Sequence, residues 1–225
     1  MDVFPALNSR LSFIRSFYFT AAPPFEALLR RHNPRYDPGE DDPPQDESER
    51  WQEARKGLEV LGHCSLSLVA KAIEDYLRQL ILREVGEMPV LRGKSKFEKY
   101  ESFLLNKTTF RWRDASSTQT SPEACCPIGR DRIEQINLCR NDFIHDPFID
   151  RGQPKQSKRH FEKYPSSRFV DPIETAVEMA SAEAAGKEFQ ASPASLTVDR
   201  HGLVSAMKDV RGFCQFVEAL NTKKP

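Results

Sequence analysis

A short stretch of the sequence brings together three side chains that could act on a phosphate group. Arg140 is followed directly by Asn141, and His145 lies four residues after Asn141. An arginine presents a planar fork of donors to phosphate oxygens and stays charged throughout the physiological pH range. A histidine can accept or donate a proton near neutrality, because its unperturbed pKa is about 6.5. Arg140, Asn141 and His145 are therefore the candidate catalytic residues.

These residues fall at the end of a helix that the sequence predicts from about Gly129 to His145. Pro147 should end it, because a proline disfavours helical geometry at the preceding residue. Asn141 and His145 share one face of this helix, whereas Arg140 lies about 140° around the axis from His145. The long arginine side chain can bend back over that edge. The inward positions are apolar, at Ile133, Ile136, Cys139 and Phe143, so the polar cluster is expected at the margin of a packed core.

Helical periodicity dominates the rest of the chain as well. From Trp51 to Ile81, apolar residues recur at steps of three and four, which predicts one long helix. The pair Asp46 and Glu49 is suited to start it, Gly86 to close it, and Gly57 and Gly62 to kink or split it. Further helices are predicted near 5–19, 24–32, 95–104, 171–189 and 203–220, and 195–198 alone alternates, as a short extended arm does. The predicted class is all-α, a bundle of long antiparallel helices with shorter added helices.

Composition divides the chain into three parts. Residues 1–33 predict an N-terminal helical extension, residues 34–49 an acidic, proline-rich linker or loop, and residues 50–220 the main helical domain. For the N-terminal helices, three roles are open: they cover the site, complete the bundle or bind a partner. Residues 114–127 are rich in Ser and Thr and predict another loop, and residues 151–168 form a basic one.

The overall composition excludes several classes of protein. The 33 basic and 33 acidic residues cancel, which argues against wholesale coating of nucleic acid. No apolar run reaches the ~18 residues of a membrane span, so we expect no membrane partner. The N-terminus lacks the basic start and apolar middle of a secretory signal. Five cysteines without regular spacing favour reduced thiols, and hence a cytoplasmic location.

The motif at 140–145 resembles the Arg-x(4-6)-His motif of the HEPN superfamily, small α-helical domains named for higher eukaryotes and prokaryotes nucleotide-binding. The typical form has a polar residue, often Asn, directly after the Arg, and Arg140-Asn141 supplies it. The context is similar too, because the helix through 67–77 looks like the early bundle helix of that family. The resemblance covers about residues 50–220, and its specific part is confined to 128–147.

Many HEPN proteins are metal-independent RNases of toxin–antitoxin, abortive-infection and CRISPR systems. The resemblance therefore implies an endoribonuclease with a defence or toxin function, in which the ribose 2′-hydroxyl attacks the phosphate. His145 would act as general base or acid, Arg140 would stabilise the transition state, and Asn141 would orient the reacting groups. One motif supplies one histidine, and the family meets this need by dimerising, so a homodimer is expected.

Two alternatives stay open at this point. One is a non-catalytic HEPN module that binds nucleotide or a partner protein through the same cleft, and the other is a helical scaffold without a site. The basic loop after the motif has two interpretations as well. Its side chains could bind RNA, with Lys155, Lys158, Arg159 and His160 as the candidates, or it could be an ordinary solvated loop.

We expect no cofactor and no metal. Cys125, Cys126 and Cys139 lack the C-x2-C spacing of zinc sites, and buried or idle thiols are the expected outcome. His63 should be a packing or surface histidine. Some HEPN toxins carry, two residues after the motif histidine, a tyrosine that a partner antitoxin modifies. Pro147 occupies that position, which puts this mode of control in doubt, although an antitoxin or other regulatory protein stays among the partners that the resemblance implies.

Overall fold

The computed structural model describes residues 3–31, 45–90, 96–107, 110–112, 125–145, 160, 163–164, 167–169 and 196–222. Of these residues, 84% are helical and 4% lie in strands, which confirms the all-α class. The described helices are α1 (Val3–Arg31), α2 (Gln45–Val85), α3 (Lys96–Lys107), α4 (Arg130–His145) and α7 (Arg200–Thr222). None of the described helices contains an apolar stretch that could span a membrane. The helix predicted at 171–189 lies outside the described residues.

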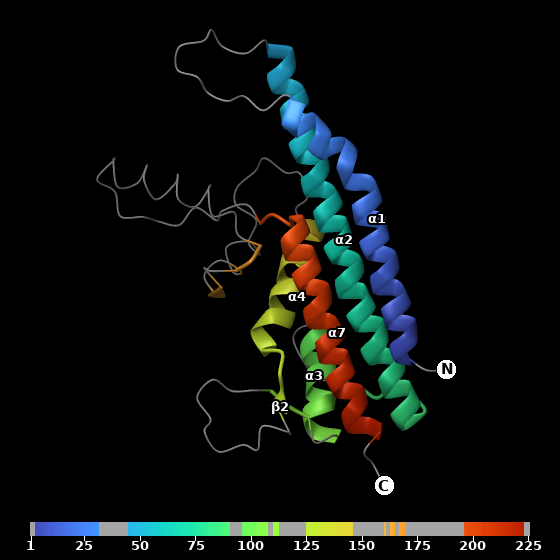
Figure 1. Ribbon diagram of the computed structural model, residues 1–225. Helices are drawn as coiled ribbons and strands as arrows, with labels where there is room; N and C mark the ends of the chain where they lie inside the picture. The colour runs from blue at the N-terminus through green and yellow to red at the C-terminus, as the bar shows by residue number, and fades with distance from the viewer. Residues whose placement is uncertain are drawn as a thin grey trace, which may run out of the picture.

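The long helix α2 is the centre of the bundle, and the other helices pack around it (Figure 1). The ion pair between Arg10 and Asp75 and the approach of Phe25 to Gly57 show that α1 and α2 are antiparallel. Helix α4 is also antiparallel to α2. Helix α7 instead runs parallel to α2, because α4 has carried the chain back along the bundle before α7 begins. This pair departs from the purely antiparallel arrangement that the sequence predicts.

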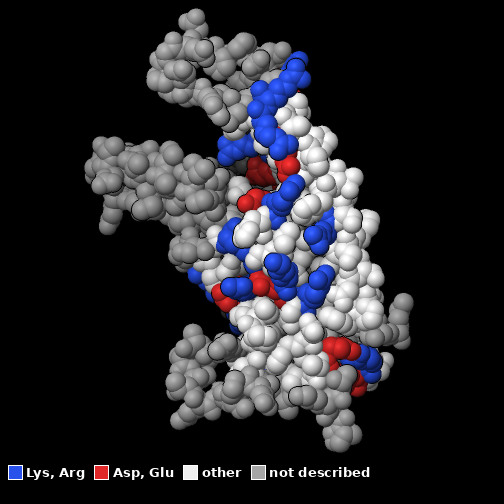
Figure 2. Space-filling view, viewed as in Figure 1, with Lys and Arg blue, Asp and Glu red and all other residues white. Residues whose placement is uncertain are grey.

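Helix α1 belongs to the same hydrophobic core as the rest of the bundle. Its inward side chains recur at steps of four, three, four and four, and each is at most 3% exposed: Leu7, Leu11, Ile14, Tyr18 and Ala22. Of the roles open for the N-terminal helices, the structure therefore shows that α1 completes the bundle. On its outer side, Phe13 is 65% exposed and its ring lies 6.4 Å from that of Phe17. Figure 2 shows that charged side chains gather along the middle of the molecule, over α7 and beside it, whereas the α1 side is mostly uncharged.

The sequence predicted two helices where the structure has the single helix α1. Pro23 and Pro24 lie inside it, although a proline removes one helical hydrogen bond and crowds the preceding turn. The burial of Tyr18 and Ala22 on one side of these prolines holds the helix against α2, so it bends rather than ends. The bend is visible towards the C-terminal end of α1 in Figure 1.

Two other predictions also need correction. Gly57 and Gly62 do not interrupt α2, which is continuous over 41 residues and begins at Gln45, inside the predicted linker. The predicted loop at 114–127 ends in a strand, β2 (Cys125–Cys126), which pairs in parallel with β1 (Arg111–Trp112). Two-residue strands carry no periodicity that a sequence could reveal. The end of α2 is as predicted, because Gly86 adopts a φ of 82° and its N–H bonds to Leu82 O at 2.9 Å.

The packing of α1 gives a direct test. Leu11→Ala should lower the free energy of unfolding by about 2–5 kcal/mol, because the side chain is 1% exposed and its removal leaves a cavity. The control Phe13→Ala, on the outer face of the same helix, should change it by no more than ~0.5 kcal/mol. Urea unfolding followed by circular dichroism measures both. Equal effects of the two substitutions would contradict the packing of α1 described above.

Candidate functional site

Helix α4 carries the candidate residues, and its inner face is anchored in the core. Ile133, Ile136 and Cys139 are each 0% exposed. Arg140 lies four residues after Ile136 and seven after Ile133, so its side chain leaves the helix on the core-facing side and is half-buried. Arg140 thus lies beside the packed core, and the prediction for the whole polar cluster stays a prediction.

The three candidate residues lie within the last two turns of α4. Asn141 is half-buried like Arg140, and His145 is the last residue of the helix. The side chain of His145 lies outside the described part of the structure. Arg140 makes no hydrogen bond or ion pair with another described residue. The two other arginines of α4 differ in this respect: Arg130 Nε lies 2.6 Å from Glu101 Oε1, and Arg132 Nη1 lies 3.2 Å from Asp209 Oδ1.

His63 of α2 holds the C-terminal end of α4 in place. The ring is 6% exposed and lies parallel to the ring of Phe143, with centroids 4.9 Å apart and an interplanar angle of 4°. Its Nε2 lies 2.7 Å from Leu196 O. Because a carbonyl oxygen can only accept, Nε2 carries the hydrogen and Nδ1 is free to accept from Cys139 Sγ at 3.9 Å. His63 thus connects α2 to α4 and to the segment that contains Leu196. Its contact on α4 is Phe143, two residues before His145.

This histidine is neutral as well as buried. Burial lowers the pKa of His63, although the hydrogen bond to Leu196 O favours the charged form. The sequence predicted a packing or surface histidine, and the structure shows packing. Its role at the end of α4 was not predicted, because Phe143 and Leu196 are far from His63 in the sequence and carry no local pattern with it.

The extended arm at 196–199 reaches α2 through Gly62, the neighbour of His63. A Cβ atom at residue 62 would lie 2.0 Å from Val198 O, so only glycine permits this approach. Leu196 and Val198 are both buried, and Thr197 N donates to Phe169 O at 2.7 Å. The predicted extended arm is therefore present from Leu196 onwards, and it is a structural part of the α4 environment.

Of the four predicted RNA-binding residues, only His160 lies in the described part of the chain. Lys155, Lys158 and Arg159 lie outside it. His160 is 0% exposed, so in this conformation its ring cannot contact RNA, and the prediction of a solvated position is not met. Its Nε2 lies 2.8 Å from Ser167 Oγ, and Ser167 Oγ lies 3.1 Å from Gln135 Oε1 on α4. Burial lowers the pKa of His160 to about 4.

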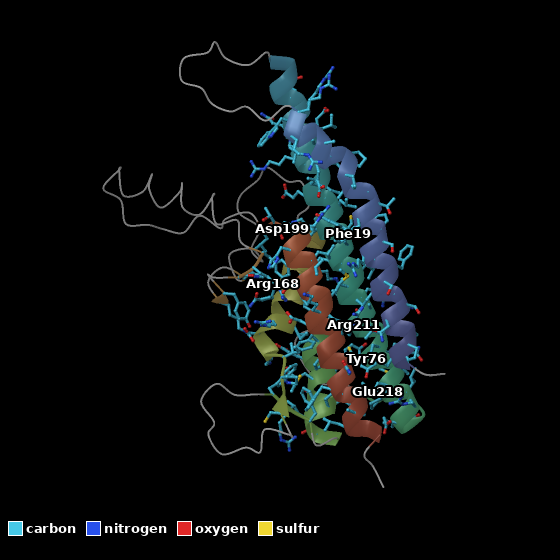
Figure 3. The ribbon with its side chains drawn as sticks, viewed as in Figure 1. Phe19, Tyr76, Arg168, Asp199, Arg211 and Glu218 are labelled. Carbon is cyan, nitrogen blue, oxygen red and sulfur yellow. The ribbon has the colours of Figure 1, made fainter. Side chains whose placement is uncertain are left out.

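Charged side chains attach the same segment to α4. Glu134 accepts hydrogen bonds from Lys163 Nζ at 2.6 Å and Tyr164 Oη at 2.8 Å, and pairs with Arg130 at 2.6 Å. Burial opposes ionisation of Glu134, but these donors outweigh it and hold its pKa below the usual value. Arg168 adds an ion pair to Asp209 of α7 and a hydrogen bond to Arg132 O at 3.1 Å (Figure 3). The described residues 160, 163–164 and 167–169 are thus connected to α4 and α7 by several polar contacts.

The cysteines show no arrangement for metal binding within the described residues. Cys126, Cys139 and Cys214 are buried, Cys64 and Cys125 are half-buried, and all five are free thiols. No group of three or more His, Cys, Asp or Glu side chains in the described ranges is placed to hold a metal ion. Burial raises the pKa of Cys126 to about 11, which makes that thiol a poor nucleophile near neutral pH.

The two buried histidines predict how stability depends on pH. His63 and His160 each have a lowered pKa in the folded chain. Below pH 6.5 the unfolded chain therefore binds more protons than the folded chain. Stability should therefore fall from pH 6.5 towards pH 4, by roughly 2–3 kcal/mol for His160, since each tenfold change in proton affinity is worth about 1.4 kcal/mol. His160→Gln should flatten this dependence in urea titrations. The control His201→Gln, at an exposed position on α7, should leave the slope unchanged, and a wild-type chain equally stable at pH 4 and 6.5 would contradict the burial of His160.

The approach at Gly62 predicts an unusual helix substitution. Gly62→Ala should destabilise the protein by about 1–3 kcal/mol, although alanine normally favours a helix, because the methyl group collides with the backbone of Val198. Gly212→Ala on α7 is the matched control, since its methyl group would meet only the Ile128 side chain, at 3.2 Å. That side chain can move, so Gly212→Ala should be neutral or stabilising. Thermal unfolding of both variants compares them, and a neutral Gly62→Ala would show that the arm does not pack on α2.

Comparisons of the chain with protein-family models, with curated proteins and with solved structures gave no match. The resemblance of the motif to HEPN proteins therefore stays a prediction. The function has to be argued from the residues of α4 and their surroundings.

Proposed function

We propose that this protein is a metal-independent endoribonuclease of HEPN type, acting as a homodimer in defence or toxicity. The observation that carries the proposal is the state of Arg140. On a helix whose other arginines are paired with carboxylates, Arg140 makes no ion pair with a described residue. A half-buried guanidinium without a carboxylate partner is suited to bind an anion, and Asn141 and His145 lie within the same two turns.

The proposed reaction needs no group beyond these side chains and the RNA. One histidine accepts the proton of the ribose 2′-hydroxyl as its oxygen attacks phosphorus, and the P–O5′ bond breaks. A second acid gives a proton to the departing 5′-oxygen. Arg140 stabilises the charge that builds up on the phosphorane oxygens, and Asn141 orients the imidazole or a phosphate oxygen. The products are a 2′,3′-cyclic phosphate and a 5′-hydroxyl.

One His145 per chain cannot be base and acid at once, which is the reason for proposing a dimer. Two copies of the motif facing each other supply both histidines and two arginines. The packing of His63 on Phe143 supports this arrangement in one respect, because it fixes the end of the helix that carries the motif.

The chemistry can be tested with purified protein and labelled RNA. His145→Ala should lower the cleavage rate by ~10²–10⁴-fold, the usual contribution of a positioned acid or base. Arg140→Ala should do comparable damage, because the phosphorane loses its counter-charge. Arg211→Ala is the matched control, an exposed arginine on α7, and should cleave at the parent rate. EDTA should have no effect, and DNA should resist cleavage because it lacks the attacking hydroxyl.

Three outcomes would contradict the proposal. Activity that disappears in EDTA and returns with magnesium would show metal-dependent chemistry. Parent activity in His145→Ala would remove the proposed acid or base. An active preparation that light scattering shows to be monomeric, rather than a dimer of about 52 kDa (twice 25.8 kDa), would remove the paired motif. Folded protein that binds nucleotide or a partner without cleaving RNA would favour the non-catalytic module.

A further inference from the structure

The three candidate residues lie where a helix is least constrained by its own hydrogen bonds. The last four carbonyl groups of an α-helix have no partner within the helix, and α4 ends at His145. Such helix ends open locally at little cost in free energy. Arg140 and Asn141 lie just before this last turn. A reaction that needs them together with His145 therefore requires contacts that hold the end of α4 from outside the helix.

His63 of α2 makes two such contacts, one at each end of the turn that follows Arg140. Its Nδ1 accepts from Cys139 Sγ at 3.9 Å, and its ring lies parallel to that of Phe143, with centroids 4.9 Å apart. Cys139 directly precedes Arg140, and Phe143 lies two residues before His145. Residues four apart share one face of a helix and are about 6 Å apart along its axis. One buried ring therefore spans the turn that connects Arg140 to His145.

The orientation of the His63 ring is fixed by its other nitrogen. Nε2 donates to Leu196 O at 2.7 Å, which leaves Nδ1 as the acceptor for Cys139. Turning the ring over would place carbon atoms where the two nitrogen atoms now bond, and the buried Leu196 would lose this donor. Leu196 belongs to the arm that packs closely against Gly62. The arm, α2 and α4 thus hold the ring from three directions.

Tyr76 provides a comparison, because it is another buried polar side chain of α2. It is 2% exposed, and its hydroxyl donates to Cys214 O and to Glu218 Oε2, both at 3.0 Å, on α7. Figure 3 shows Tyr76 further along the bundle than Asp199, which adjoins the arm. None of its hydrogen bonds reaches a described residue of α4. Tyr76 is therefore a reference for a polar contact of α2 that supports the bundle away from the motif.

We propose that His63 is a positioning residue for the RNase reaction, which holds the backbone at Arg140 and His145 in the arrangement that one phosphate group requires. This inference rests on the proposed function, because it names a residue on which that reaction depends. His63 is buried and does not touch the RNA, so it acts through Cys139 and Phe143. A displacement of reacting groups by about 1 Å can lower a rate by ~100-fold. The loss of His63 should therefore appear in the rate of cleavage rather than in the affinity for RNA.

Two substitutions of His63 separate its hydrogen bonds from its bulk. His63→Gln keeps an amide that can donate to Leu196 O and accept from Cys139, whereas His63→Leu can do neither. With a labelled single-stranded RNA of mixed sequence and protein in excess, His63→Leu should cleave about 10–100-fold more slowly than the parent, and His63→Gln should stay within about 5-fold of it. The affinity for DNA of the same sequence, which lacks the attacking hydroxyl, should be unchanged in both variants.

Tyr76→Phe is the matched control. It removes the hydrogen bonds to Cys214 O and Glu218 and should lower the melting temperature, but it should leave the rate of cleavage unchanged. Circular dichroism confirms that all three variants are folded. The proposal is overturned if folded His63→Leu cleaves at the parent rate, if His63→Gln is as slow as His63→Leu, or if Tyr76→Phe slows cleavage equally. A weaker affinity for DNA with an unchanged rate of cleavage overturns it as well.

A measurement that needs no activity distinguishes this inference from the RNase proposal. In protein labelled with ¹⁵N, NMR follows the side-chain N–H of Arg140 and the ring of His145. His63→Leu should shift or broaden both signals, whereas Tyr76→Phe should leave them at the parent positions. A parent chain that does not cleave RNA overturns the RNase proposal, and shifts in His63→Leu then still show that His63 positions the two side chains. Unchanged signals in His63→Leu, in a parent chain that cleaves RNA, overturn the positioning role alone.

Discussion

Helix α2 has to bury side chains on several sides at once, because α1, α3, α4 and α7 all pack against it. Different stretches of the helix meet this demand with different side chains. Near its middle, Leu66, Val69 and Ile73 supply apolar contacts, each at most 2% exposed. Towards its C-terminal end, Tyr76 reaches α7, where its hydroxyl donates to Cys214 O at 3.0 Å and to Glu218 (Figure 3). Every other helix takes its position from this one.

The same demand explains why polar residues of α2 occur inside the bundle. His63 is buried, but it is neutral and both ring nitrogens have partners, so no charge is placed in the core. Gly62 lets the arm approach closely enough for that hydrogen bond to form. The motif helix is therefore supported by a neutral contact on its inner side, while the charged Arg140 lies beside it. A charged histidine at position 63 would disturb both features.

The spacing of apolar residues along the sequence was sufficient to predict much of the fold. The helices α2, α4 and α7 follow from apolar steps of three and four, and Gly86 ends α2 as its left-handed conformation requires. The continuity of α1 was not visible, since Pro23 and Pro24 act locally and the packing that overrides them is tertiary. The β1–β2 pair, the burial of His160 and the contacts of His63 join residues that are distant in sequence. The candidate residues of α4 could be found from sequence because they share one short segment.

The sharing of one core by α1 and α2 has a consequence for how the chain can vary. Composition alone marks residues 1–33 as a removable extension. Yet deleting α1 would uncover the apolar side of α2 that now packs against Leu7, Leu11 and Ile14, and such exposed surfaces cause aggregation. Related chains that lack this helix would need polar residues on that side of α2, or another helix in its place. The first helix and the second therefore depend on each other, because each covers an apolar side of the other.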